Sequence, residues 1–178
     1  MVILSYAHPL VLDDGTPRFP KARVVMSRVE YEFWSSPELR ARLGSGSIYG
    51  RAELENLMAA WVDRCLPPAR ERHERLSGET EIASGITTFD AAGHISVAIS
   101  SGADSLLFAD DLLIVREHAA DADWTSMFDL DPQTLVQTRR RLPDGAAADR
   151  NLVFHYHFGE AGRFRRRGAH WEWEPRDP

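Results

Sequence analysis

The chain has 178 residues, 43% hydrophobic and 27% charged, with a formal net charge of −6. This length suits one core, so we predict a single domain over residues 1–178. The acidic balance argues against a nucleic-acid partner, and no apolar run reaches the ~20 residues of a membrane-spanning helix. A single cysteine excludes an internal disulfide and, with no convincing signal peptide at the start, favours the cytoplasm.

The charges are unevenly distributed. Residues 101–131 hold eight acidic residues and one arginine, whereas residues 133–170 hold eight arginines and three acidic residues. One interpretation is that the two segments are neighbours in a sheet and neutralise each other. The alternatives are that the basic segment binds an anion, or that the acidic segment serves for docking or for a metal ion.

The first half of the chain predicts two strands followed by helices. Residues 2–12 and 22–34 read as strands, the first of them broken by a proline. Ser36-Pro37-Glu38 has the N-cap, the first-turn proline and the acidic residue that begin a helix. Residues 50–66 carry one apolar stripe at helical spacing, and residues 69–76 suggest a solvent-facing helix of mixed charge.

Strand patterns dominate from residue 79 onward. The turn at residues 90–93 predicts a hairpin. The predicted strands before the last hairpin are 79–89, 94–100, 105–109, 112–117 and 134–141. We therefore expect an α+β fold: a curved antiparallel sheet of about six to eight strands, with two or three helices from residues 36–77 packed on it, in a cone-like or half-barrel shape.

This order of elements, helices before a curved sheet, is similar in outline to that of the NTF2-like small-molecule-binding domains. The resemblance rests on element order, carries no diagnostic motif, and leaves the strands before residue 36 unexplained. It implies a cavity between the helices and the sheet. A calycin-like closed β-barrel is the alternative architecture.

Residues 151–173 form the stretch richest in reactive side chains. Residues 151–158 alternate as a strand, residues 159–162 supply a glycine-containing turn, and residues 163–173 return as a second strand. Depending on the turn, this register places His155 opposite Arg166 or Arg165. A nearby arginine disfavours the charged form of a histidine, so a neutral imidazole could act as a base.

The candidate site follows from this hairpin. We predict His155 and His157 as catalytic bases and Arg166 as the anchor of an anionic group. The remaining candidates for ligand binding are His170, Tyr156, Trp171 and Trp173. The alternative is a half-exposed strand face that carries polar and aromatic side chains and has no functional site.

We predict neither a metal ion nor a cofactor. The His-x-His spacing of His155 and His157 occurs in metal sites, but the neighbouring arginines make a bound cation unfavourable. Residues 117–123 offer carboxylates and a histidine without the spacing of a calcium loop, which favours a solvated acidic loop. The sequence contains no G-x-S-x-G, H-E-x-x-H, C-x-x-C or dinucleotide-binding fingerprint.

These features favour a protein that binds a small organic, anionic ligand in a sheet-lined cavity. If it is an enzyme, we expect a cofactor-free cyclase, isomerase or dehydratase that uses histidine acid–base chemistry. The alternative is a protein–protein interaction module of the antitoxin, immunity or adaptor type that uses the acidic residues 101–131. An aromatic strand near the C-terminus also suggests a homodimer.

Overall fold

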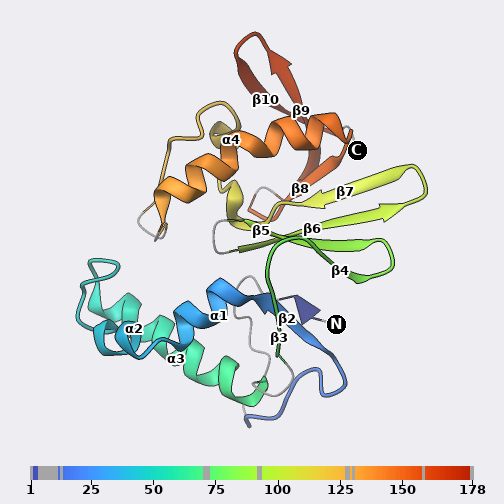
Figure 1. Ribbon diagram of the computed structural model, residues 1–178. Helices are drawn as coiled ribbons and strands as arrows, with labels where there is room; N and C mark the ends of the chain where they lie inside the picture. Colours follow the sequence, from blue (N-terminus) through green and yellow to red (C-terminus); the bar gives the residue numbers. More distant parts are fainter. Residues whose placement is uncertain are drawn as a thin grey trace. The chain divides into compact units, whose positions relative to one another are not determined.

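The structure of the chain is a computed structural model, which describes residues 2–3, 12, 14–69, 73–91, 94–126, 129, 131–157 and 159–176. The chain divides into two compact units, residues 1–77 and 78–178 (Figure 1). The division into one domain over residues 1–178 stays a prediction. Among the helices that are described, none has the length and apolar character needed to cross a bilayer.

The first unit contains a short parallel sheet. Its three strands have the order β1 (Val2–Ile3), β2 (Val24–Ser27) and β3 (His73–Leu76). All four residues of β2 are buried, as expected for the middle strand of a parallel sheet. The crossover from β2 to β3 passes through three helices, because parallel neighbours cannot be joined by a tight turn.

These helices are α1 (Arg28–Ser35), α2 (Pro37–Arg42) and α3 (Ala52–Ala69). The predicted start of α2 is confirmed, since the Ser36 side chain accepts a hydrogen bond of 3.0 Å from the Leu39 amide. Residues 44–50 lead into α3 around the buried carboxylate of Glu55. Burial raises the pKa of Glu55, but amide hydrogen bonds from Tyr49, Ile48 and Gly46 outweigh it and hold this pKa below its usual value.

Two predictions for this unit are wrong. Residues 22–34 contain a four-residue strand followed by α1, rather than one long strand. Residues 73–76 form β3, although their mixed charges suggested a helix. Pairing with buried β2 supplies the backbone hydrogen bonds that decide this segment, and the side-chain pattern does not report them.

The second unit is built on a seven-stranded sheet of order β10-β9-β8-β7-β6-β5-β4. The strands are β4 (Thr80–Ala83), β5 (Ile86–Ala91), β6 (His94–Ser101), β7 (Asp104–Phe108), β8 (Leu152–His155), β9 (Glu160–Arg167) and β10 (His170–Pro175). The predicted hairpin around residues 90–93 is confirmed as the β5–β6 pair. Residues 92–93 themselves lie outside the described residues.

One strand pair in this sheet is parallel. β7 and β8 run side by side in the same direction, while every other pair in the seven-stranded sheet is antiparallel. The connection between them contains two short 3-10 turns, η2 (Asp110–Leu112) and η3 (Arg116–Ala119), and the helix α4 (Pro132–Ala148). Figure 1 shows α4 running across the β8–β10 part of the sheet. Leu135, Leu142 and Ala146 of α4 join the same apolar core as Val153, Phe164 and Trp173.

The α+β class is confirmed, and the sheet is not closed, so the calycin-like barrel is wrong. The sheet is also mixed rather than purely antiparallel. The predicted strand at residues 134–141 lies inside α4, whose start is capped by a 3.1 Å hydrogen bond from the Thr134 amide to Asp131. The packing of helices from residues 36–77 on this sheet stays a prediction.

Candidate functional site

The candidate site lies where the parallel strands β7 and β8 end. Phe108 pairs with Phe154 at these ends, and the Ala109 amide donates a hydrogen bond of 3.1 Å to the Phe154 carbonyl. The residues that follow both strands are therefore brought together. Ligands in sheets with parallel strands commonly bind just beyond the carboxyl ends of those strands.

Asp111 and His157 meet at this position. Asp111 follows β7 and His157 follows β8, and Nε2 of His157 lies 2.7 Å from Oδ1 of Asp111. The Asp111 side chain is 14% exposed and the His157 side chain is 37% exposed, so the pair is sheltered but open to water. Asp110, between β7 and Asp111, adopts a φ of 50°, which is uncommon for a residue other than glycine.

His155, the last residue of β8, has a different environment. Its side chain is fully buried and packs edge-on against Trp173 at 4.6 Å and Phe164 at 6.2 Å between ring centroids. Burial lowers the pKa of His155 to about 3. The imidazole is therefore neutral at pH 7, as predicted, but the cause is desolvation and not a neighbouring arginine.

On β9, the strand next to His155, Glu160 forms an ion pair with Arg116. Glu160 lies opposite His155 in the β8–β9 pair. Its carboxylate accepts a 3.1 Å hydrogen bond from the Trp173 indole and forms a 2.7 Å ion pair with Arg116. These contacts fix the indole ring that packs on His155.

A buried arginine ties the β7–β8 connection to α4. Arg139 of α4 is 1% exposed, and its guanidinium donates to the carbonyls of Leu112 and Trp124. Burial and the charge of Arg139 lower the pKa of the nearby His118, so this imidazole is also neutral at pH 7. His118 accepts a hydrogen bond from the Ile114 amide through Nδ1. Arg139 thereby holds the segment that begins with Asp110 and Asp111.

The predicted hairpin of residues 151–173 is in fact three strands. β8 ends at His155, β9 begins at Glu160, and a second turn precedes β10. The predicted cross-strand pairs between His155 and an arginine are therefore wrong. Phe158, which was assigned to the first strand, lies outside the described residues.

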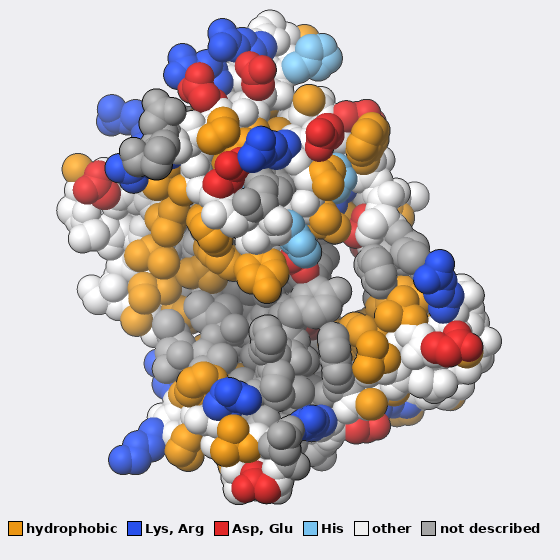
Figure 2. Space-filling model, turned by 180° about the vertical axis from the view of Figure 1, so that it is seen from behind, with side chains coloured by type: hydrophobic (Ala, Val, Ile, Leu, Met, Phe, Trp, Pro, Cys, Tyr) orange, Lys and Arg blue, Asp and Glu red, His pale blue; other side chains and the backbone are white. Residues whose placement is uncertain are grey.

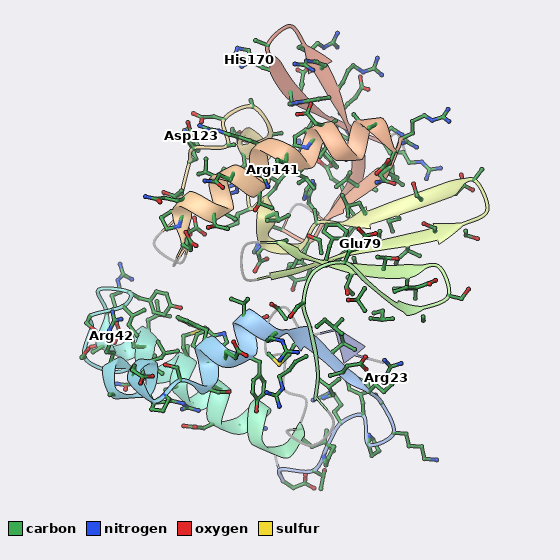
Figure 3. The ribbon with its side chains drawn as sticks, in the orientation of Figure 1. Arg23, Arg42, Glu79, Asp123, Arg141 and His170 are labelled. Atoms are coloured by element: carbon green, nitrogen blue, oxygen red, sulfur yellow. The ribbon has the colours of Figure 1, made fainter. Side chains whose placement is uncertain are left out.

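The structure divides the predicted site residues into two groups. His155, Tyr156 and His157 lie together at the end of β8, and Trp173 packs on His155. Arg166 stacks on Trp171 at 5.5 Å further along the β9–β10 hairpin, six residues beyond Glu160, which corresponds to roughly 20 Å of strand. His170 lies at the hairpin tip (Figure 3). Arg166, Trp171 and His170 are thus placed away from the Asp111–His157 pair.

The far end of this hairpin is a charged surface. Arg165 pairs with Glu174 at 2.5 Å and Arg167 pairs with Glu172 at 2.9 Å across β9 and β10. Figure 2 shows basic, acidic and histidine side chains gathered at the top of the view, where the hairpin ends. Such exposed ion pairs contribute little to stability. Two of the arginines that suggested an anion site, Arg165 and Arg167, are therefore matched by carboxylates of the next strand.

Sequence reasoning missed Asp111 as a partner of His157, and Glu160 and Arg139 as the groups that support the site. The signal for Asp111 was present, because two acidic residues directly follow the apolar strand β7. Its use required knowing that β7 and β8 are parallel neighbours. That in turn required recognising α4 as the crossover helix.

Comparisons with known proteins place the fold. No family model matches the chain, and no curated protein matches it. Among solved structures, AidC, a dizinc quorum-quenching lactonase, has a TM-score of 0.80 at 20% identity, over 98% of this chain and 63% of that chain. The hydrolase AbOPH of the β-lactamase superfamily has a TM-score of 0.79 at 20% identity, over 98% of this chain and 63% of that chain. The chain has the metallo-β-lactamase fold.

A third neighbour is a probable metal-dependent hydrolase from Staphylococcus aureus, with a TM-score of 0.74 at 16% identity, over 99% of this chain and 62% of that chain. The chain therefore spans less than two thirds of the length of these structures.

The fold overturns both functional predictions. The neighbours are hydrolases, not cofactor-free cyclases, isomerases or dehydratases, and not interaction modules or simple binding proteins.

The fold raises the question of a metal centre, since AidC is a dizinc enzyme. A catalytic zinc ion takes three protein ligands and keeps one position open. Within the ranges that the structure describes, no group of three or more His, Cys, Asp or Glu side chains is placed to hold a metal ion. The described donors therefore do not fit a metal centre.

Proposed function

We propose that this chain is a hydrolase that cleaves an ester or lactone bond. The likeness of nearly the whole chain to hydrolases of the metallo-β-lactamase fold supports this proposal. The observation that carries it to particular residues is the 2.7 Å contact between His157 and Asp111 beyond the ends of the parallel strands. A half-exposed imidazole beside a sheltered carboxylate can activate water.

The proposed reaction needs only water as co-reactant. His157 takes a proton from a water molecule as the water oxygen forms a bond to the carbonyl carbon of the substrate. The resulting tetrahedral intermediate breaks its bond to the ester oxygen, which receives the proton back from the imidazolium. The products are a carboxylic acid and an alcohol, or a single hydroxy acid when the substrate is a lactone.

Neighbouring side chains suggest further roles at the same site. Tyr156 is 60% exposed and lies next to His157, with ring centroids 5.5 Å apart, so we propose that it contacts the substrate. His155 is enclosed by aromatic rings, so its proposed role is to hold the end of β8 in place. Arg166, His170 and Trp171 keep only the predicted role of ligand binding, at the other end of the hairpin.

The test is hydrolysis by the purified full chain. Further neighbours are described as N-acyl homoserine lactone lactonases or hydrolases, so N-hexanoyl-L-homoserine lactone and p-nitrophenyl butyrate are suitable probes. We expect acid release that exceeds the buffer rate, and a fall in kcat of about 10²–10⁴-fold in His157→Ala. Asp104→Asn, at the exposed start of β7, should keep the rate of the unaltered chain. If the full chain hydrolyses neither of the two probes, the proposal is refuted.

Three sequence-based proposals concern the surroundings of the protein. The single cysteine supports a location in the reducing cytoplasm. The aromatic β9–β10 hairpin supports a homodimer, the acidic net charge supports the absence of a nucleic-acid partner, and the lack of an apolar run of ~20 residues supports the absence of a membrane partner. Sedimentation of the purified chain would test the dimer.

A further inference from the structure

The donor atoms around the candidate site are engaged with one another. Nε2 of His157 faces Asp111, and the Glu160 carboxylate is shared between Arg116 and Trp173. The imidazole of His155 is closed in by the rings of Trp173 and Phe164. A metal ion would have to displace these contacts, and among the described side chains no third ligand stands beside the Asp111–His157 pair.

We infer that Asp111 and His157 act as a metal-free general-base pair, and that the described residues of this chain do not assemble the dizinc centre for which its neighbour AidC is named. The role of Asp111 and His157 as a general-base pair rests on the proposed hydrolase function. The absence of a dizinc centre does not rest on that function and can be measured directly.

The geometry assigns a separate task to each ring nitrogen of His157. In the tautomer in which Nε2 of His157 donates its proton to Oδ1 of Asp111, the lone pair of the imidazole lies at Nδ1. No hydrogen bond to Nδ1 occurs within the described ranges, which leaves this atom available to a water molecule. Asp111 is thus a positioning residue that selects the tautomer, and His157 is the catalytic residue.

Zinc binding by the full chain tests the metal part. The purified protein is incubated with excess ZnCl2, passed through a desalting column with a mild chelator, and analysed for zinc by mass spectrometry. We expect well under one zinc ion per chain, with the same value for Asp111→Asn and for the control Asp104→Asn. Two zinc ions per chain, reduced in Asp111→Asn and retained in the control, would overturn the inference.

Chemical rescue tests the catalytic part. We expect lactone hydrolysis by the full chain to be unchanged after treatment with EDTA. The activity lost in His157→Ala should return in part when imidazole is added, because a free base can replace the missing side chain. A structural role of His157 would not respond to imidazole, so rescue supports the base and its absence overturns it.

Asp111→Asn separates positioning from folding. The amide keeps the shape of the side chain but can donate to Nε2, which favours the opposite tautomer. We expect a fall in kcat of about 10²-fold or more with little change in KM. An unchanged kcat would overturn the role of Asp111.

The outcomes distinguish this inference from the proposed function. Hydrolysis that requires two bound zinc ions would keep the hydrolase and overturn the metal-free pair. A chain that neither binds zinc nor hydrolyses the probes would refute the hydrolase, and with it the catalytic part of the inference. Hydrolysis without zinc, lost in His157→Ala and rescued by imidazole, supports both.

Discussion

His155 and His157 are two positions apart, yet their surroundings give them opposite uses. The strand β8 ends at His155 and a turn follows it. His155 therefore faces the core, while His157 faces Asp111 and water. The alternating sequence suggested one shared face, because it continued the strand to Phe158. A strand that ends three residues earlier separates the two imidazoles.

The buried state of His155 makes the stability of the chain depend on pH. Its folded pKa is about 3, below the value of 6.5 in an unfolded chain, so the unfolded state binds more protons. The contribution of His155 is therefore fully present above pH 6.5 and is lost as the pH falls from about 6.5 towards 3. Between pH 7 and pH 5 the loss amounts to about 2 kcal/mol.

His155→Phe tests this dependence. The replacement keeps an aromatic ring against Trp173 and Phe164 and cannot be protonated. We expect urea unfolding at pH 7 and pH 5 to show a loss of stability about 2 kcal/mol smaller in the variant than in the unaltered chain. His118 titrates with the same sign in both proteins, so its contribution cancels in the comparison. Equal losses in the two proteins would contradict the assignment.

At the scale of elements, α4 shows why part of the second unit could not be predicted. The inward face of this helix carries Leu135, Arg139, Leu142 and Ala146, so a buried arginine interrupts the apolar stripe. Without that stripe the segment resembles an alternating strand. The arginine is buried because carbonyls of the β7–β8 connection need a donor, a requirement that becomes visible only in the fold.

Replacing either of two glycines of the second unit by alanine is expected to change stability, in opposite directions. A Cβ at Gly162 of β9 would lie 2.6 Å from Cζ2 of Trp173, whereas a Cβ at Gly145 of α4 meets no atom within 4 Å. Gly162→Ala should therefore push the indole ring off His155 and lower the free energy of unfolding by about 1–3 kcal/mol. Gly145→Ala should raise it by about 0.5–1 kcal/mol, because alanine suits a helix interior.

Urea unfolding followed by tryptophan fluorescence measures both effects. The native emission of Gly162→Ala should also shift, since Trp173 moves relative to Glu160 and His155, and Gly145→Ala should keep the native spectrum. If both variants have the same stability, the close contact between β9 and Trp173 does not constrain the strand.

For the whole molecule, the sequence was enough to predict the α+β class, the helices starting at Ser36 and in residues 50–66, and the β5–β6 hairpin. These elements are local and carry their own capping, periodicity or turn signals. The parallel pair β7–β8 and the contact of Asp111 with His157 are non-local, and they join residues 46 positions apart. No local pattern encodes such a pairing, so the site could be predicted only on the histidine side.

The single-domain prediction concerns the whole molecule and has a measurable consequence. Residues 1–77 form a compact unit of a size at which one core rarely supplies more than about 3–5 kcal/mol. If the chain is one domain, this unit unfolds together with residues 78–178. Hydrogen exchange in increasing urea, followed by mass spectrometry, should then give one midpoint for the amides of Val24–Ser27 and of Leu152–His155. An earlier midpoint for Val24–Ser27 would show that the chain consists of two domains, and that the first is the weaker one.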